Sequence, residues 1–301
     1  MRIADVLVVG AGPAGVAAAA QCARLGLQVR IVDRTGRAGG LVANGFLVEN
    51  YPGLEPLPGE ALAARLGAHL ARFELVVERR EVRDLVNDDG VWIVTADREE
   101  IAARAIVLAV GTKGKPLGAE GEAQARDRVF TELRELLVAL PRPVHVVVVG
   151  GGEASLDTAL SLAARGASVT LLVRSAALKA RGRLAEIVAR TPAIEIRLTA
   201  RVVRIVPSDG ALAVEVAYLD GVRFLGADAV LVAIGRTPAL EPIFPSCGHG
   251  RPKGRQIEVS PDLFVCGDAR SGGLGQIGIA VGDGLEAAGI IAGRILRPGD
   301  R

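Results

Sequence analysis

The first 33 residues carry the pattern that most constrains the fold. An apolar, largely β-branched run over residues 5–9 leads into three glycines, Gly10, Gly12 and Gly15, and an alanine-rich stretch follows. This is G-x-G-x-x-G between an expected strand and an expected helix, the arrangement that binds the pyrophosphate of a dinucleotide. The next strand ends at Asp33, where a carboxylate would hold a ribose hydroxyl. The stretch predicts a dinucleotide site, and a plain βαβ turn is the alternative.

Each glycine of this loop has its own expected role. Gly10 permits the tight turn, Gly12 lets the backbone approach the pyrophosphate, and Gly15 lets the helix pack closely on the strand. The N–H groups at the start of the helix would then face the phosphates.

The same plan returns about 140 residues later. A strand over residues 143–149 leads to Gly150, Gly152 and Ser155, where serine is small enough for close packing. A helix over 156–165 and a strand ending at Arg174 follow. This internal duplication predicts two nucleotide-binding units.

The remaining segments predict an α/β fold with one unit inserted in the other. A tail after residue 238 is too short to be a domain and is expected to return to the first unit. We therefore expect two Rossmann-like, three-layer dinucleotide-binding domains, with residues 1–114 and 239–301 in one and 115–238 in the other. The other expected helices cover residues 60–73, 128–140 and 280–296, and the other expected strands include 75–86, 91–96, 105–112 and 263–269.

Composition excludes several classes of function. A net charge of +2 on 301 residues is too small to favour nucleic-acid or membrane binding. The apolar runs are too short to span a membrane, and the first strand leaves no room for a signal peptide, so a cytoplasmic protein is expected. Three scattered cysteines and three scattered histidines predict neither a disulfide framework nor a metal site.

The motifs also carry a family resemblance. The sequence Gly-Ala-Gly-Pro-Ala-Gly at 10–15 resembles the FAD pyrophosphate loop of two-dinucleotide-binding-domain flavoproteins, in particular their thioredoxin-reductase-like branch. Gly39-Gly40-Leu41 with the stretch at 48–53 is similar to the G-G-x…V-E-N-[WY]-P-G signature of that branch. Gly267-Asp268 with Gln276-Ile277 resembles its closing flavin motif.

The resemblance implies an FAD site. Asp33 would hold the FAD ribose, Val82 would lie at the adenine, Asn50 would face the isoalloxazine, and Asp268 would bind the ribityl and phosphate end. Backbone N–H groups of the last motif would stabilise negative charge on the ring. The alternative for Asn50 and Asp268 is turn and cap chemistry. The full predicted set is Gly10, Gly12, Pro13, Ala14, Gly15, Asp33, Arg34, Gly40, Leu41, Asn50, Val82, Ala109, Gly111, Gly267, Asp268, Gln276 and Ile277.

The second unit is predicted to bind NADPH, with NADH as the alternative. Its second strand ends in Arg174 rather than a carboxylate, and a cation there suits a 2′-phosphate. The H-R-R usual in the family reads Val173-Arg174-Ser175 here, and a solvated helix face is the alternative for the basic residues that follow. The predicted set is Gly150, Gly152, Glu153, Ala154, Ser155, Arg174, Lys179, Arg181 and Gly235.

The chain departs from thioredoxin reductases in its thiols. Those enzymes carry C-x-x-C directly before the second nucleotide motif, and residues 126–143 of this chain contain no cysteine. A dithiol relay needs one attacking and one resolving sulfur. Cys22, Cys247 and Cys266 lie far apart in sequence and are expected to be packed or surface thiols, so no side chain is predicted to be catalytic.

The expected function follows from these points. The sequence Gly-Gly-Gly-Glu-Ala-Ser-Leu-Asp-Thr-Ala-Leu at 150–160 resembles the corresponding motif of ferredoxin/flavodoxin–NADP reductases, which also lack the dithiol. This implies an FAD-dependent NAD(P)H oxidoreductase that passes electrons to an external acceptor such as ferredoxin or flavodoxin. The open alternatives are a disulfide such as thioredoxin, a quinone or oxygen as acceptor, and a flavin-binding sensor with a decayed nicotinamide site. The family also implies a homodimer.

Overall fold

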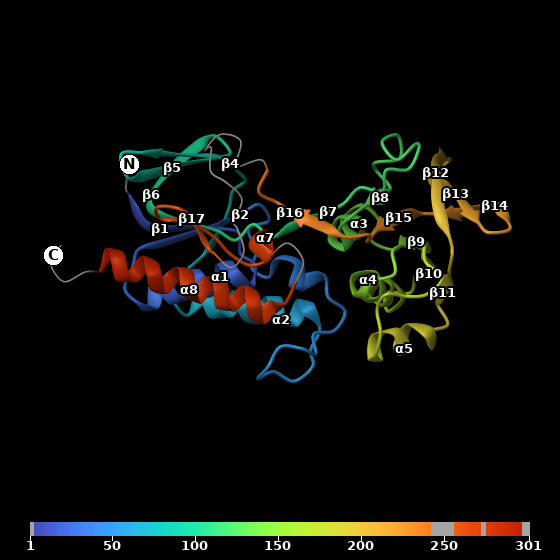
Figure 1. The fold of residues 1–301 in the computed structure, drawn as a ribbon, viewed down its shortest axis with the longest axis horizontal. Helices are drawn as coiled ribbons and strands as arrows, with labels where there is room; N and C mark the ends of the chain where they lie inside the picture. The colour runs from blue at the N-terminus through green and yellow to red at the C-terminus, as the bar shows by residue number, and fades with distance from the viewer. Residues whose placement is uncertain (1–2, 242–255, 272–274, 297–301) are drawn as a thin grey trace. The chain divides into compact units, whose positions relative to one another are not determined.

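The computed structural model describes residues 3–241, 256–271 and 275–296 (Figure 1). The chain separates into two compact units. The first contains Met1–Ala43, Val48–Thr112 and Thr237–Arg301, and the second contains Asn44–Leu47 and Lys113–Arg236. Within the described ranges, no helix is long and apolar enough to cross a membrane.

A twisted sheet forms the centre of the first unit, with strand order β17-β18-β6-β1-β2-β3. Neighbouring strands from β18 to β3 are parallel, and β17 is antiparallel to β18. The hairpin β4–β5 pairs with the long strand β6. The strands are β1 (Ala4–Val9), β2 (Val29–Asp33), β3 (Val77–Arg79), β4 (Val82–Asp88), β5 (Val91–Ala96), β6 (Glu99–Leu108), β17 (Glu258–Ser260) and β18 (Leu263–Val265).

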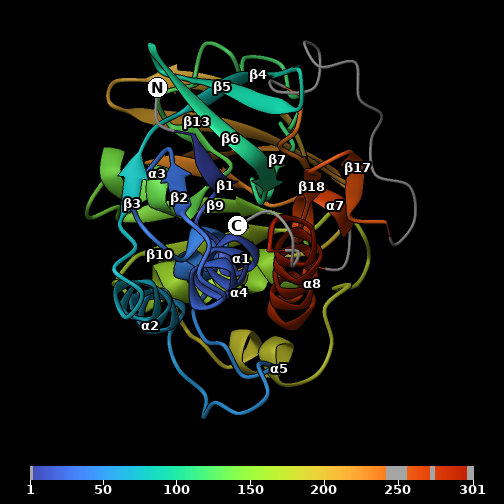
Figure 2. The same ribbon diagram turned by 90° about the vertical axis from the view of Figure 1, so that its left-hand side faces the viewer.

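Helices cover one face of this sheet and the β4–β5 hairpin lies over the other (Figures 1 and 2). Along β1 and β6, side chains alternate between the two faces. Val8 and Val107 pack under the helices, whereas Leu7 and Ile106 pack on the hairpin side. Both faces are therefore buried, as in other parallel sheets. The helical segments are α1 (Pro13–Arg24), the 3₁₀ turn η1 (Gly40–Asn44), α2 (Gly59–Ala71), α7 (Asp268–Ser271) and α8 (Ile277–Ile295).

The C-terminal tail completes the first unit, which confirms the expected insertion. Strand β18 pairs in parallel with β6, with Leu263 opposite Ile106, and α8 lies along α1 (Figure 2). The stretches between the units form two short strands, β7 (Thr112–Gly114) and β16 (Arg236–Pro238).

The second unit repeats the plan with a five-stranded parallel sheet, order β11-β10-β9-β15-β8. Helices α4 and α5 cover one face, and the antiparallel sheet β12-β13-β14 covers the other. The elements are β8 (Val129–Phe130), α3 (Leu133–Ala139), β9 (His145–Val149), α4 (Glu153–Ala163), β10 (Ser168–Leu172), α5 (Arg183–Ala189), β11 (Ile194–Arg197), β12 (Arg201–Ser208), β13 (Ala211–Tyr218), β14 (Gly221–Ala227) and β15 (Ala229–Val232).

Both units place the strand that precedes the glycine loop next to the point where strand order reverses. In the first unit β1 lies between β2 and β6, and in the second β9 lies between β10 and β15. Open α/β sheets bind ligands at this point, outside the carboxyl ends of the strands. Both glycine loops follow these strands directly.

Three predictions about elements were wrong in part. The single strand expected over 75–86 is two strands, because β3 pairs with β2 and the chain then turns into the β4–β5 hairpin. The helix expected over 128–140 begins only at Leu133, because Val129 and Phe130 extend the parallel sheet. Strand β18 ends at Val265, so Cys266 lies just beyond the strand rather than in it.

Candidate functional site

The glycine loop after β1 is packed too closely for side chains at two positions. A Cβ at Gly10 would lie 2.3 Å from the carbonyl oxygen of Ala109, and the φ of Gly10 is +100°. A Cβ at Gly15 would lie 1.8 Å from the carbonyl oxygen of Gly10. The loop therefore requires glycine at both positions, and this brings α1 close to the ends of β1 and β6.

The space around Gly12 is different, because it is open. A Cβ there would meet no atom within 4 Å, apart from its own neighbours. Gly12 is the N-cap of α1, with no side-chain cap and no acidic residue in the first turn. The first N–H groups of a helix lack intrahelical acceptors and attract anions. Pro13 and Ala14 begin this turn. Gly40 lies close beside the loop, because a Cβ at Gly40 would lie 3.1 Å from the Cα of Gly12. With the free N–H groups of the turn and the open space at Gly12, the loop has the donors and the space that a pyrophosphate needs.

Asp33, at the end of β2, connects this loop to the next one. Its Oδ2 accepts the N–H of Ala11 at 3.0 Å. Its Oδ1 accepts the N–H of Thr35 at 2.8 Å and the Thr35 hydroxyl at 2.6 Å. Arg34 beside it is exposed. The carboxylate thus lies at the carboxyl end of β2, where a ribose would bind. It also fixes the backbone of the glycine loop and of the loop that follows β2.

The residues expected near the isoalloxazine meet at the start of α8. Asn50 donates from Nδ2 to Oε1 of Gln276 at 2.9 Å, and Gln276 is the N-cap of α8. Ile277, the first residue of the helix, packs against the small buried cluster of Val48, Leu57 and Leu62, as Tyr51 and Leu54 do. Two segments that are distant in sequence are therefore held together by both polar and apolar contacts.

The remaining predicted FAD residues lie on other parts of the first unit. Ala109 and Gly111 follow β6, and Gly267 and Asp268 follow β18, so all four lie at the carboxyl edge of adjacent strands. Leu41 lies in η1. Val82 begins β4 and packs against the apolar cluster on the hairpin side of the sheet.

The glycine loop of the second unit repeats the first. A Cβ at Gly150 would lie 2.4 Å from the carbonyl oxygen of Ala233 and 3.0 Å from the Cβ of Ser155. Ser155 is buried, and its hydroxyl donates to the carbonyl oxygen of Gly152 at 2.7 Å. Gly152 is the N-cap of α4, with open space beside it, and Glu153 begins the helix with an exposed side chain. Ala154 follows in the same turn.

The predicted cations follow β10, next to this loop. Arg174 and Arg181 are exposed. The N–H of Lys179 donates to the carbonyl oxygen of Gly151 at 2.8 Å, so the basic segment is held against the glycine loop. Gly235 lies beyond the end of β15, with a φ of +124°. These positions fit a coenzyme that carries a phosphate on its ribose.

The described cysteines are not reactive thiols. Burial raises the pKa of the Cys22 thiol in α1 to about 12 and raises the pKa of Cys266 as well. Cys247 lies outside the described residues. Residues 126–143, which contain no cysteine, include α3, whose Leu133 and Leu136 are buried in the core of the second unit.

One side chain with a structural role was missed by sequence reasoning. Asp157 on α4 accepts the N–H of Phe46 at 2.9 and 3.0 Å, and both residues belong to the second unit. Burial raises the pKa of this carboxyl above its ordinary value of 3.8, and the backbone N–H groups of Phe46 and Leu47 oppose that shift. The motif at 150–160 contains Asp157, but nothing in it points to residue 46.

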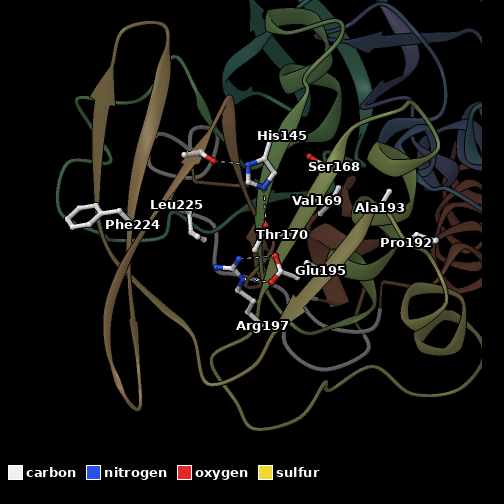
Figure 3. Close-up of a pocket in the computed structure, with 11 residues that line it drawn as sticks. His145, Ser168, Val169, Thr170, Pro192, Ala193, Glu195, Arg197, Phe224 and Leu225 are labelled. Carbon is white, nitrogen blue, oxygen red and sulfur yellow. Dashed lines mark hydrogen bonds and ion pairs between the residues drawn. The ribbon is translucent and has the colours of Figure 1, made fainter.

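A pocket of about 410 Å³ lies elsewhere on the second unit (Figure 3). It opens at His145, the first residue of β9, whereas the glycine loop follows the last residue of that strand. The His145 ring bonds Gly226 and Thr170, and Arg197 pairs with Glu195 through two hydrogen bonds of 2.8 and 2.9 Å. The charged and imidazole side chains that line this pocket thus bond other protein groups, and we assign the pocket no ligand.

Comparisons with known proteins agree with this architecture. The model of the pyridine nucleotide-disulphide oxidoreductase family matches residues 4–284. A thioredoxin reductase of Bacillus subtilis (strain 168) is 29% identical over 297 residues, which cover 95% of this chain and 93% of the relative.

Solved structures give the same result. The crystal structure of T. acidophilum thioredoxin reductase has a TM-score of 0.85 and 27% identity, and the match covers 99% of this chain and 100% of that chain. That of Lactococcus lactis thioredoxin reductase has a TM-score of 0.84 and 25% identity, over 96% and 97% of the two chains. This chain therefore belongs to the pyridine nucleotide-disulphide oxidoreductase family and is a flavin-dependent oxidoreductase with the two-Rossmann-domain fold. Its thioredoxin-reductase-like relatives use FAD and NADPH.

Proposed function

We propose that this flavin-dependent oxidoreductase passes electrons from NADPH through FAD to an external acceptor, ferredoxin or flavodoxin, without a dithiol of its own. The observation that carries the proposal is α3. Residues 126–143, where the family resemblance implies a C-x-x-C in thioredoxin reductases, contain no cysteine, and α3 within them buries Leu133 and Leu136 in the core. The described thiols are protonated at neutral pH because burial raises the pKa of each.

The first unit is proposed to bind FAD and the second NADPH. Gly12 and the first turn of α1 would hold the pyrophosphate, Asp33 the ribose, and Asp268 the ribityl and phosphate end. Asn50 and Gln276 would lie beside the ring system. FAD itself supplies the redox chemistry, because it exchanges a hydride with a nicotinamide and electrons with an acceptor. The protein provides binding, orientation and hydrogen-bond donors, and no side-chain acid or base is required.

The second candidate acceptor is a protein disulfide. Its support is that the relatives are named thioredoxin reductases. A chain without adjacent thiols would need the acceptor disulfide to react at the flavin directly. A quinone and oxygen are further acceptors that such a flavin could serve. A sensor without turnover is the least supported, since both glycine loops have the same close packing.

An anaerobic titration tests the proposal. NADPH should bleach the flavin absorbance of the purified holoenzyme, and a protein whose flavin stays oxidised would not be an NADPH-dependent enzyme. The reduced protein is then mixed in separate runs with ferredoxin, flavodoxin, oxidised thioredoxin, a quinone and air-saturated buffer. We expect the fastest reoxidation with ferredoxin or flavodoxin, and a faster reaction with thioredoxin would favour the second candidate.

A variant with Cys22, Cys247 and Cys266 all replaced by serine is the matched control. Under the proposal it keeps its rate with every acceptor, because electrons leave from the flavin and not from sulfur. A loss of thioredoxin reduction alone would show a thiol route. The cytoplasmic location and the homodimer stay predictions.

A further inference from the structure

A buried ion pair lies behind the turn that presents Asp268. Asp283 on α8 is only 6% exposed. Its Oδ2 and Oδ1 accept Nε and Nη2 of Arg270 on α7, both at 2.8 Å. A paired, two-bond contact of this kind fixes orientation as well as charge.

The same carboxylate also holds the turn itself. Oδ2 of Asp283 accepts the N–H of Gly267 at 2.8 Å. Gly267 has a φ of +69°, and a Cβ there would lie 3.0 Å from the Cβ of Ala14 and 3.4 Å from that of Ala280. The turn therefore fits between the first turn of α1 and α8, and Asp283 supplies the acceptor for its N–H group. A buried N–H without an acceptor would be costly.

We propose that Asp283 and Arg270 are positioning residues for FAD. Arg270 orients the Asp283 carboxylate, the carboxylate fixes the Gly267 N–H, and the fixed turn sets where Asp268 stands relative to the first turn of α1. This inference rests on the role proposed above for Asp268. It assigns the ion pair to cofactor affinity rather than to fold stability alone.

Charge balance decides the choice of variants. Removing one partner of a buried pair leaves an uncompensated charge and destabilises strongly, whereas neutralising both is often tolerated. The variant D283N/R270Q removes both charges; Asn keeps the shape of the Asp283 side chain, and Gln keeps part of the apolar stem of Arg270. We expect its apoprotein to melt close to the wild type but to bind FAD about tenfold or more weakly, the loss typical of a charge-assisted hydrogen bond. The visible spectrum of its bound flavin should shift toward that of free FAD.

The matched control is a second ion pair of the same unit, at the other end of α8. Arg294 bonds Glu258 through Nη1 and Nη2 at 2.6 and 2.8 Å, and Oε1 of Glu258 accepts the N–H of Asp262 at 3.1 Å. This pair thus also holds one backbone N–H. The variant E258Q/R294Q should keep the FAD affinity and the flavin spectrum of the wild type.

Binding is measured as the quenching of FAD fluorescence on titration into apoprotein, with thermal melting as the check on folding. R270K keeps both charges and should recover most of the affinity that D283N/R270Q loses. If the double variant does not fold, D283E carries the test, because it keeps the charge balance but displaces the acceptor by one methylene and should weaken FAD binding several-fold.

An unchanged FAD affinity in a folded D283N/R270Q, or in D283E if that is the variant measured, overturns the inference. An equal loss of affinity in the Arg294 control does so as well, because the effect would then be one of general stability. Failure of the proposed function is a different result, since it shows as wild-type apoprotein that takes up no FAD or as bound FAD that NADPH does not reduce.

Discussion

We predict that the choice between NADPH and NADH depends on Arg174. It lies two residues beyond the end of β10 and is exposed, and the backbone N–H of Lys179, further along the same segment, is bonded to the glycine loop. Arg174→Ala should raise the KM for NADPH about tenfold and the KM for NADH much less, because only NADPH carries a phosphate for this cation to bind. Steady-state kinetics with both coenzymes measures the ratio.

Arg190→Ala is the control for this prediction, because Arg190 is also exposed but lies beyond the end of α5. It should leave both KM values unchanged. Equal increases for NADPH and NADH in Arg174→Ala would contradict the assignment of Arg174 to a 2′-phosphate.

The raised pKa of Asp157 predicts a pH dependence of the stability of the protein. The pKa of this carboxyl is raised in the folded chain, so its contribution to stability is full below the unfolded value of 3.8 and is lost as the pH rises through the folded value. Asparagine does not titrate and still accepts the Phe46 N–H. The Tm of Asp157→Asn should therefore improve relative to the wild type as the pH rises from about 4 toward neutrality.

Melting curves across this range measure the difference between the two proteins. Asp127→Asn, at an exposed side chain, corrects for the general effect of removing one negative charge. A difference between Asp157→Asn and the wild type that does not vary with pH would show that burial does not disfavour the ionised carboxylate.

Among single residues, the sequence predicted the glycines of the loop but not the roles of the buried acidic side chains. Gly10 and Gly15 were predicted because their spacing, together with the flanking elements, has a physical meaning within one short stretch. Asp157 and Asp283 were not, because each acquires its role from a partner that is distant in the chain. Residue 46 and residue 270 meet them only after folding.

Among elements, α8 is held very close to α1. A Cβ at Gly284 would lie 2.2 Å from the carbonyl oxygen of Ala14 and 3.0 Å from the backbone nitrogen of Ala18. Gly284→Ala should therefore cost about 1–3 kcal/mol of stability through overpacking. It should also weaken FAD binding, because Ala14 belongs to the first turn of α1. Denaturant unfolding and FAD titration measure the two effects.

On the same helix, Gly282 has space for a side chain, in contrast to Gly284. Gly282 is exposed, and a Cβ there would meet no atom within 4 Å. Gly282→Ala should stabilise the protein by about 0.5–1 kcal/mol, because alanine is the better helix former. If both substitutions had the same sign, the close approach of α8 to α1 would be refuted.

Element boundaries show where local patterns fail. The expected strand over 75–86 contains two strands whose partners differ, and its apolar pattern alone does not mark the turn between them. Strand β14 was missed because most of its residues are exposed, so its sequence lacks the alternation of a half-buried strand. Backbone pairing with β13 holds it in place.

For the whole molecule, duplication and return of the tail were the two global features that the sequence predicted. Both can be recognised because a repeated motif, and a tail too short to be a domain, are evident from the sequence without any knowledge of tertiary contacts. The antiparallel sheet β12-β13-β14 and the β4–β5 hairpin, each covering one face of a parallel sheet, were not assigned to layers.

The division into two units predicts separate responses to the two coenzymes. Adding FAD to the apoprotein should slow amide hydrogen exchange in α1, in the Gly267 turn and at the start of α8, because these segments would line one site. Adding NADP⁺ should slow exchange at the start of α4. Protection of β12-β13-β14 by FAD to the same degree as α1 would contradict this assignment.

The place of β18 beside β6 has a consequence for biosynthesis. When the ribosome has made residues 1–112, β5 can pair with the first half of β6, but residues 106–108 lack their neighbour on one side, because β18 is not translated until after the whole second unit. The second unit is nearly continuous in the chain and can fold as it emerges. The nascent first unit must therefore wait with this end of β6 unpaired on one side, a state prone to aggregation, and truncation before residue 263 should trap the protein there.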